Sequence, residues 1–338
     1  MIKKIKKTIS IIFVFAFSIV YTLSFLLFWR DNNFNPDSQF VYINKGDSFN
    51  SITEKLFDGS IIYSKQLFNW AGVILNYDKK IKTGKYEIKS GMSNLELLKT
   101  ISDFKNSVTS KVTIYEGLNN RRLAHLLKKE ISIDSVKFIS ETKNLKYLKI
   151  YDKNVKSLEG FLLPDTYNFE WQEDESFIVK NLVEEFNKFF VDSLQRRMKQ
   201  INLSLNEVVT MASLVEGETK ISEERSIVAG VYYNRLKKRM RLEADPTIQY
   251  LVNNGPRRLF FSDLKIESEY NTFINYGLPP GPINNPSRES IIAALYPAKH
   301  NLLFFVANGK GGHTFASNYE EHKKNVAVYR KIISELRK

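Results

Sequence analysis

An uncharged run from Thr8 to Trp29 constrains the fold of this 338-residue chain more than any other feature. It is rich in Ile, Phe, Val and Leu, and a helix of this length matches the roughly 30 Å hydrocarbon core of a bilayer at about 1.5 Å per residue. The following residues, Arg-Asp-Asn-Asn at 30–33, contain no small-x-small cleavage pattern. The sequence therefore predicts an uncleaved, single transmembrane helix.

Charge predicts the orientation of this helix. Four lysines lie within residues 3–7, and the positive-inside rule keeps such a cluster in the cytoplasm. We therefore expect residues 1–7 to be a cytoplasmic tail, residues 8–29 to anchor the chain in the inner (plasma) membrane, and the remainder to lie outside, in the periplasm. The formal charge of +13 favours anionic partners. On that side of the membrane we expect a cell-envelope polymer rather than nucleic acid.

Composition excludes several kinds of chemistry. The hydrophobic content of 43% is ordinary for folded domains, and the length suits two domains plus a small segment. The chain has no cysteine, which excludes disulfides, cysteine nucleophiles and cysteine-ligated metals. Its four histidines form no HExxH motif, and GxSxG, P-loop and dinucleotide-binding motifs are absent. We expect no metal site and no cofactor.

The segment after the anchor has the pattern of a small α+β module. Residues 30–39 are polar and contain a proline, which predicts a linker. Residues 40–108 then alternate between strand and helix patterns: strands at 40–43 and 82–88, and helices at 49–57, 64–75 and 94–102. This order resembles a LysM-like module, a type known for binding amino-sugar polymers. The alternative is a generic α+β spacer.

Residues 109–338 are predicted to form one larger, mixed α+β catalytic domain. A strand and turn at 112–117 open it, and residues 302–307 are the best candidate for a buried strand. Helical patterns cover residues 119–130, 174–200, 204–219, 222–239, 287–296 and 318–337, while the chain after Met240 is rich in loops. The whole chain is therefore expected to be an α+β protein with an N-terminal transmembrane helix.

The predicted helix at 204–219 carries the most informative acidic residues. An apolar run ends in Glu216 and Glu218, and a carboxyl held against apolar neighbours has a raised pKa, as a glycosidase acid requires. Two residues apart on a helix, they point about 200° away from each other. Glu218 continues the apolar face, which slightly favours it as the acid, although spacing alone does not decide. The alternative is that both glutamates are solvated.

A second carboxylate is available in a later loop. Asp245 or Glu243 is suited to work with one of the two helix glutamates. For Asp245 the alternative is a helix-capping role before Thr247. His313 follows a glycine-rich turn, where it suits substrate binding or a structural hydrogen bond across the turn.

Seven segments together resemble one known family, the endolytic murein transglycosylases of the MltG (YceG-like) type. They are 158–167 (LEGFLLPDTY), 211–219 (MASLVEGET), 231–236 (VYYNRL), 242–247 (LEADPT), 270–272 (YNT), 277–283 (GLPPGPI) and 309–315 (GKGGHTF). The resemblance runs in the same order over nearly the whole chain. Two positions depart from the family pattern: Gly217 stands where lysine is usual, and Phe273 where tyrosine is usual. The glycine is expected to make the helix more flexible beside the key glutamate.

The resemblance implies that Glu218 is the catalytic residue. The family cleaves the β-1,4 bond between N-acetylmuramic acid and N-acetylglucosamine within glycan strands, without water, and leaves a 1,6-anhydro end. A single acid suits this chemistry, because the nucleophile is the substrate's own C6 hydroxyl. The resemblance also implies a role in ending the elongation of nascent strands and a partnership with peptidoglycan synthases.

The groups expected to line the sugar cleft are polar or aromatic, as suits sugar binding; for each of them a structural role is about as well supported by the sequence. They are Glu216, Asn234, Asp245, Gln249, Tyr270, Asn271, Pro280 and His313. Two other functions remain open from the sequence. One is a muramidase that uses water with Asp245 or Glu243, and the other is a non-enzymatic peptidoglycan-binding scaffold.

Overall fold

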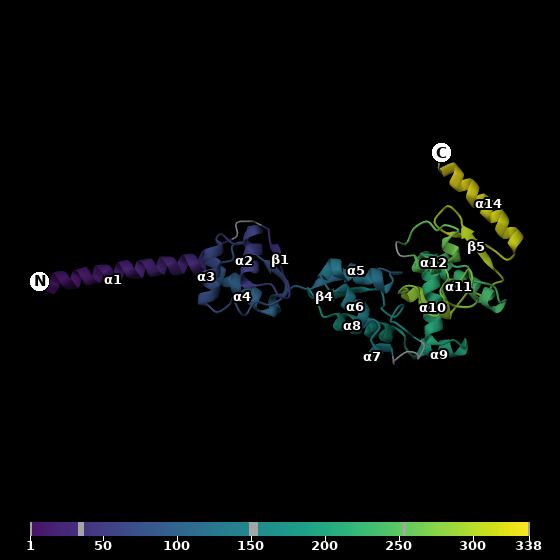
Figure 1. The fold of residues 1–338 in the computed structure, drawn as a ribbon, viewed down its shortest axis with the longest axis horizontal. Coiled ribbons are helices and arrows are strands. Elements are labelled where there is room, and N and C mark those ends of the chain that lie inside the picture. The colour runs from purple at the N-terminus through teal and green to yellow at the C-terminus, as the bar shows by residue number, and fades with distance from the viewer. Residues whose placement is uncertain (1, 33–36, 149–154, 253–254, 337–338) are drawn as a thin grey trace. The chain divides into compact units, whose positions relative to one another are not determined.

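The computed structural model describes residues 2–32, 37–148, 155–252 and 255–336 (Figure 1). The chain divides into two compact units. The first comprises Met1–Lys111 with Asn168–Glu173, and the second comprises Val112–Tyr167 with Asp174–Lys338. Each unit is described separately below.

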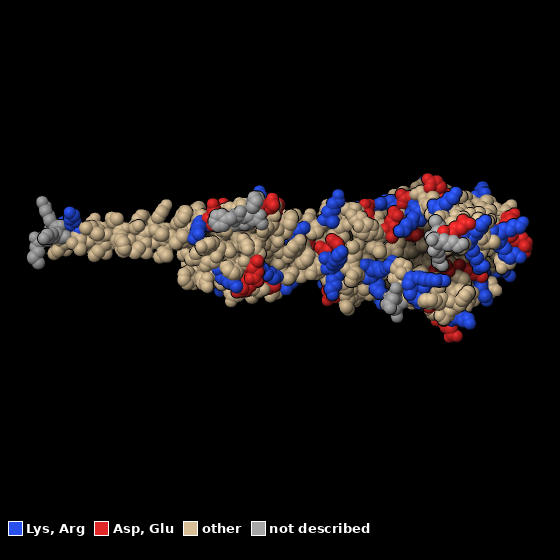
Figure 2. Space-filling model, turned by 90° about the horizontal axis from the view of Figure 1, so that it is seen from above, with Lys and Arg blue, Asp and Glu red and all other residues tan. Residues whose placement is uncertain are grey.

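The chain begins with the apolar helix that the sequence predicts. Helix α1 (Ile2–Ser24) continues into a π-helical turn, η1 (Phe25–Trp29). The segment Ile5–Trp29 is long and apolar enough to cross a membrane. In Figure 2 it is tan along its length, with lysine blue at its tip. The helix lies outside the hydrophobic core, as expected of a segment whose natural solvent is lipid.

The first unit is built around an antiparallel pair of strands. Strand β1 (Gln39–Ile43) pairs with β2 (Gly84–Ile88), with Val41 opposite Tyr86. Three helices complete the unit: α2 (Phe49–Asp58), α3 (Lys65–Ile74) and α4 (Asn94–Ser102). Each begins after a serine whose side chain caps it, because serine oxygen satisfies a free N–H of the first turn. A short 3₁₀ turn, η2 (Phe104–Asn106), follows α4.

The predicted order of strands and helices is therefore present in this unit, around a single apolar core. The core includes Val41, Ile43, Leu56, Phe68, Tyr86, Ile88, Leu97 and Ile101. One difference concerns the predicted linker at 30–39. Asn32 is buried, and its amide donates to Asn94 Oδ1 at 2.7 Å, so the module already includes this residue.

A short segment from later in the chain also belongs to the first unit. Residues 168–173, which the sequence analysis placed in the catalytic domain, pack here. The Trp171 ring lies 4.5 Å from the Tyr42 ring, and its indole N–H donates to Asn44 Oδ1 at 2.9 Å. A half-buried aromatic ring with a satisfied polar group anchors a segment, which explains why this excursion joins the module.

The second unit is mainly helical, with a short two-stranded sheet in which β5 (Phe304–Ala307) pairs with β6 (His313–Ala316). The chain passes from one unit to the other within another strand pair, β3 (Ser110–Thr113) and β4 (Thr166–Phe169). The helices before the site are α5 (Asn120–Ile131), α6 (Ser135–Glu141), α7 (Leu145–Leu148), α8 (Glu175–Phe189) and α9 (Asp192–Gln200). Those that follow are α10 (Leu205–Glu218), α11 (Ser222–Lys237), α12 (Asp245–Leu251), α13 (Arg288–Leu295) and α14 (Tyr319–Leu336), with a 3₁₀ turn, η3 (Asp263–Lys265).

Helix α10 is the centre of this unit. It packs against α11, α12 and α13, and nearly all of its residues from Val208 to Glu216 are buried (Figure 1). A helix that is apolar on all sides must lie inside a domain. The end of α10 is therefore held by three neighbouring helices.

Some elements differ from the prediction. The helix predicted at 174–200 is two helices, because the chain leaves helical geometry at Phe190, whose ring stacks on Phe186 at 5.8 Å. Strand β5 forms at the predicted place, but its residues are only half-buried. The loop-rich stretch after Met240 contains α12, which the sequence analysis did not predict. Its proline at the second position is typical of a helix start.

Candidate active site

The last turn of α10 positions both glutamates of the Glu-x-Glu-Thr motif. The helix starts with a capping box between Ser204 and Glu207, and it ends at Glu218 as Thr219 becomes extended. Its apolar sides fix its rotation against α11, α12 and α13. Glu216 and Glu218 consequently face different surroundings, as their spacing predicts.

Glu216 is buried and fully bonded. Its Oε2 accepts hydrogen bonds from the Ser287 backbone N–H at 2.9 Å, from Ser287 Oγ at 2.5 Å and from Ser290 Oγ at 2.8 Å. Its Oε1 lies 3.6 Å from Nη2 of Arg225. Ser287 is the N-cap of α13. Glu216 therefore joins the end of α10 to the start of α13.

Arg225 carries the positive charge opposite Glu216. It is 5% exposed, and its Nη2 also lies 3.5 Å from Glu116 Oε2. Its Nη1 donates to Ser222 Oγ at 3.1 Å. Burial and the negative charge of Glu216 raise the pKa of Glu116, while Arg225 opposes that rise. The guanidinium thus bridges two carboxylates, and a buried charge needs such partners.

Glu218 has a different environment from Glu216. The Tyr232 hydroxyl donates to its Oε1 at 2.5 Å. Burial, helped by the nearby charge of Asp245, raises the pKa of the Glu218 carboxyl to about 7, against the opposing effects of the Tyr232 hydrogen bond and of Arg235. The negative end of the α10 dipole acts in the same direction as burial, since Glu218 is the last helical residue. This carboxyl still carries its proton in a substantial fraction of molecules at neutral pH.

Tyr232 remains a hydrogen-bond donor throughout. Its side chain is 1% exposed, and burial together with the charge of Glu218 raises its pKa well above the ordinary value for tyrosine. Its ring packs edge-on against Phe305 of β5 at 6.0 Å. In the sequence, Tyr232 stands out only as part of the VYYNRL segment. Its role depends on how α10 and α11 pack, which the VYYNRL motif alone does not reveal.

Asp245 faces the same space as Glu218. It is the first residue of α12, and the helix has no side-chain cap, so the capping alternative is not realised. The side chain is exposed to the cleft, yet surrounding atoms remove enough water for burial to raise its pKa. The adjacent Pro246 approaches α10 closely: a Cβ at Gly217 would lie 2.5 Å from Pro246 Cβ. Gly217 therefore permits close packing, which corrects the expectation of added flexibility.

A cleft of about 680 Å³ opens over Glu218. Of the predicted site residues, the structure brings together Glu216, Glu218, Asp245 and Gln249 in its lining. The Gln249 amide is already bonded to the backbone of Arg257, donating to its oxygen at 2.6 Å and accepting from its N–H at 3.1 Å. Lining residues that the sequence analysis missed include Tyr115, Glu116, Asn119, Arg121, Arg122, Lys220, Tyr250 and Asn284.

Two predicted amides are occupied elsewhere. Asn234 lies outside the cleft lining, and its Nδ2 donates to the carbonyls of His300 at 2.8 Å and Leu302 at 3.0 Å. Asn271 is fully buried and donates to the carbonyls of Leu264 and Ile266. Both side chains hold loops in place. Their amide donors are bound to backbone in this structure, and neither residue is in the lining of the cleft over Glu218.

Three further predicted residues also lie outside that lining. Tyr270 and Pro280 border a small cavity of about 40 Å³, and the Tyr270 ring lies 5.1 Å from that of Tyr250. His313 binds Glu224 through its Nδ1 at 2.7 Å and its backbone N–H at 2.8 Å. Tyr270 therefore contacts a cleft residue, and His313 ties the start of β6 to Glu224 of α11.

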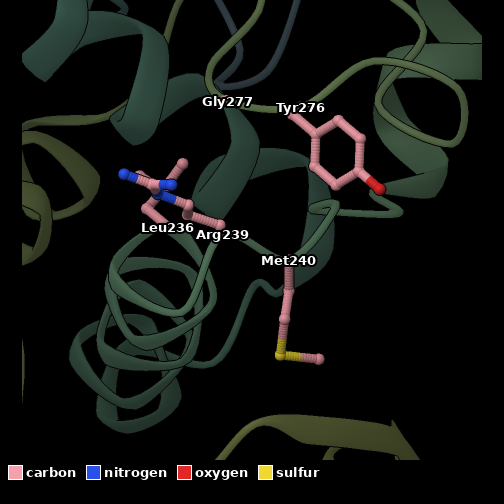
Figure 3. Close-up of a pocket in the computed structure, with 5 residues that line it drawn as sticks. All are labelled: Leu236, Arg239, Met240, Tyr276 and Gly277. Atoms are coloured by element: carbon pink, nitrogen blue, oxygen red, sulfur yellow. The ribbon is translucent and has the colours of Figure 1, made fainter.

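A second pocket, of about 470 Å³, lies beside the end of α11 (Figure 3). It is lined by Leu236, Arg239, Met240, Tyr276 and Gly277, and contains no carboxylate. Over the described part of the chain, no group of three or more His, Asp or Glu side chains is placed to hold a metal ion. Of these two pockets, the cleft over Glu218 is therefore the one that carboxyl groups line.

Comparisons with known proteins agree with this geometry. Residues 41–328 match the YceG-like family. This chain belongs to that family. It is 32% identical over 305 residues to an endolytic murein transglycosylase of Bacillus subtilis (strain 168), covering 86% of this chain and 84% of that protein.

Two more distant relatives extend the comparison. An endolytic murein transglycosylase of Streptococcus pneumoniae (strain D39) is 28% identical, and the match spans 86% of this chain but 58% of that protein. The crystal structure of a YceG-like protein from Listeria monocytogenes is similar with a TM-score of 0.63 and 29% identity, covering 85% of this chain and 98% of the other. The family match at residues 41–328 includes residues of both units.

Proposed function

We propose that this chain is a membrane-anchored lytic transglycosylase that cuts nascent peptidoglycan strands internally. The bond cleaved is the β-1,4 bond between N-acetylmuramic acid and N-acetylglucosamine. The observation that carries the proposal is Glu218: its pKa is raised to about 7 by burial, and it lines a cleft. The names of the relatives and the family membership support the same reaction class.

The first step is protonation of the leaving group. Tyr232 donates to Glu218 Oε1, which leaves Oε2 to carry the acid proton. Oε2 gives that proton to the glycosidic oxygen as the bond to the muramyl anomeric carbon breaks and positive charge develops on the sugar ring. The resulting carboxylate is stabilised by the Tyr232 hydrogen bond and by the charge of Arg235.

The second step closes the anhydro ring. The C6 hydroxyl of the same muramyl residue attacks the anomeric carbon, and its proton returns to Glu218. No water is consumed, and the enzyme regains its starting protonation state. Because the nucleophile is part of the substrate, its effective concentration is high and no second carboxylate needs to attack. One well-placed acid is therefore sufficient.

The rest of the molecule suits an extended polymer outside the membrane. Tyr115 and Tyr250 line the cleft beside polar groups, a combination that binds sugar faces and hydroxyls. We propose that the first unit acts as a LysM-like glycan-binding module. The helix Ile5–Trp29 would anchor the chain in the membrane with its N-terminus in the cytoplasm. By cutting the glycan strand, the enzyme would end strand elongation and would work together with peptidoglycan synthases.

A water-using muramidase is the second candidate, because Asp245 lines the same cleft and its pKa is raised by burial. Product analysis separates the two reactions. Full-length protein in detergent is incubated with uncrosslinked glycan strands, and the products are weighed by mass spectrometry. Anhydro ends, formed by the wild type and not by Glu218→Gln, support the proposal. Reducing muramic ends would reject it in favour of the muramidase. Glycan left uncut by both proteins would leave only a binding scaffold.

A further inference from the structure

The pocket beside the end of α11 is not used by the mechanism above. One of the side chains that line it is the ring of Tyr276, which is 66% exposed. The guanidinium carbon of Arg241 lies 5.0 Å from the centroid of this ring and holds it in place. In Figure 3 the ring lies across the hollow from Leu236 and Arg239. An ordered and largely exposed aromatic ring thus lines a pocket of about 470 Å³.

A smaller pocket of about 260 Å³ continues this surface toward the cleft. It shares Tyr276 and Gly277 with the first pocket and extends along the chain to Pro280. Asn284, which follows on the same loop, lines the cleft over Glu218. Tyr276 and Asn284 are eight residues apart in the sequence, so their Cα atoms are separated by about 29 Å at most. One loop therefore leads from the Tyr276 pocket to the cleft.

Hydrogen bonds fix the loop that carries Tyr276. The Asn275 side-chain amide donates to the carbonyl of Asn271 at 3.0 Å, and Asn271 is fully buried. Further along the loop, the Asn206 side-chain amide of α10 donates to the carbonyl of Pro280 at 2.9 Å. A surface that is ordered before its ligand arrives loses less conformational entropy on binding. The loop is therefore suited to present Tyr276 to a ligand.

The side chains of the pocket suit a sugar. The C–H face of a sugar ring packs on an aromatic side chain, while hydroxyl and acetamido oxygens accept hydrogen bonds from a guanidinium group. Tyr276 supplies the aromatic surface, and the exposed Arg239 supplies the donors. Leu236 and Met240 add apolar surface that suits the methyl group of an acetamido group. The pocket thus combines the contacts that an N-acetylated sugar needs.

We propose that the pocket lined by Tyr276 and Arg239 is a distal subsite for sugar units of the strand whose cleaved bond lies over Glu218. The inference rests on the proposed function and deepens it, because a strand that is cut internally must extend beyond the cleft. Since one loop lines both pockets and reaches the cleft, the occupant is the same strand rather than a separate molecule. Affinity should therefore increase with strand length until the strand reaches Tyr276.

The test measures binding as a function of strand length. Uncrosslinked strands are freed of their peptides with an amidase, separated by length, labelled, and titrated with full-length Glu218→Gln protein in detergent, which should bind strands without cutting them. Adding Tyr276→Ala should raise the Kd of long strands roughly tenfold, since one aromatic contact contributes about that much. The Kd of a tetrasaccharide should not change. Tyr276→Phe keeps the ring and should retain the affinity for long strands.

Two further substitutions in the same Glu218→Gln protein sharpen the assignment. Tyr296 is the matched control: it is 47% exposed, the guanidinium carbon of Arg197 lies 5.0 Å from its ring centroid, and it lines neither the pocket nor the cleft. Tyr296→Ala should therefore leave every Kd unchanged. Arg239 has a φ of +52°, which glycine adopts more readily, so Arg239→Gly should preserve the fold. It should raise the Kd of long strands roughly threefold through the lost hydrogen bonds.

Strands that keep their peptides are titrated in parallel, and three results would overturn the subsite. The first is an unchanged Kd of long strands with Tyr276→Ala, and the second is an equal rise for the tetrasaccharide, which would place the effect in the cleft. The third is a rise only for strands that keep their peptides, which would make a peptide the occupant. Cleavage by the wild type is measured separately. Its absence would reject the proposed function, and the Kd values would still support or overturn the subsite.

Discussion

The two sides of the last turn of α10 differ in how their carboxyl groups are satisfied. On one side Glu216 receives three hydrogen bonds from Ser287 and Ser290 and lies near Arg225. On the other side Glu218 receives one hydrogen bond, from Tyr232, and lines the cleft. The residues are of one type and two positions apart. Their surroundings alone separate a carboxyl that joins α10 to α13 from one that lines the cleft with a raised pKa.

The physical basis of this difference is the number of hydrogen-bond donors and cations that surround each buried carboxyl group. A carboxylate with several donors and a cation can stay ionised in the interior, and it then stabilises the elements that it joins. A carboxyl with fewer donors keeps its proton at higher pH, which is useful for catalysis and costs stability when the group ionises.

Replacing Glu218 by Gln should abolish cleavage while leaving the fold intact. Glutamine keeps the shape and an acceptor for Tyr232 but cannot transfer a proton, so we expect kcat to fall by roughly 1,000-fold or more. The rate of anhydro-product formation measures this. Circular dichroism near pH 4 should show the wild-type melting temperature, because the folded wild type keeps Glu218 protonated there. A variant with more than a tenth of the wild-type activity would remove Glu218 from the mechanism.

Replacing Glu216 by Gln should lower the stability of the protein, whereas Glu218→Gln should remove its activity. The serines keep an acceptor, but the buried Arg225 loses a negative partner, and removing one partner of a buried pair costs about 3 kcal/mol. Urea unfolding of the full-length protein measures the change. Glu116 remains near Arg225 and limits the loss. An unchanged free energy of unfolding would show that the Glu216 network does not stabilise the end of α10.

The pH dependence of stability should distinguish the wild type from Glu218→Gln. The folded pKa of Glu218 is raised from 4.5 to about 7, so its contribution to stability is present below pH 4.5 and lost as pH rises through about 7. The glutamine variant does not lose it. We expect the variant to be more stable than the wild type by on the order of 1–3 kcal/mol at pH 9, and equal at pH 4. Glu159 is present in both proteins, so its titration does not affect the difference in stability between them. Equal stability of the two proteins at pH 9 would contradict the raised pKa of Glu218.

Replacing Tyr232 by Phe should change the rate least. Tyr232 lowers the pKa of Glu218 by donating to it, so its loss should raise that pKa further. The alkaline limb of the pH profile of kcat/KM then moves upward, and kcat falls by roughly tenfold because the carboxylate formed in the first step loses a donor. A limb that stays in place, or moves downward, would mean that the Tyr232 bond does not reach the reacting acid.

Much of the fold could be predicted because it is local. Capping serines and apolar spacing located α4 and the end of α10, and the hydrophobic run located α1. The break between α8 and α9 and the short helix α12 were missed, because both depend on tertiary packing more than on periodicity. Residues 168–173 were assigned to the wrong unit for the same reason: Trp171 is held by Tyr42 and Asn44, far away in the sequence.

The residues of the site also divide into those that local sequence could predict and those that depend on tertiary packing. The apolar face of α10 favoured Glu218 as the acid, and the structure places it in the cleft with a raised pKa. Asn234 and Asn271 were assigned to the sugar cleft, yet both hold loops. An amide that binds backbone and one that binds sugar are the same residue in a sequence. Tyr232 was missed because its contact with Glu218 exists only once α11 packs on α10.

Titration of Glu218 itself tests the central claim most directly. Full-length protein with carbon-13 in the glutamate carboxyls is followed by NMR over the pH range, and Glu218→Gln identifies the resonance. The account predicts a midpoint at about 7 for this residue. A midpoint near the ordinary glutamate value of 4.5 would contradict it, because the group would then have no proton to give at neutral pH.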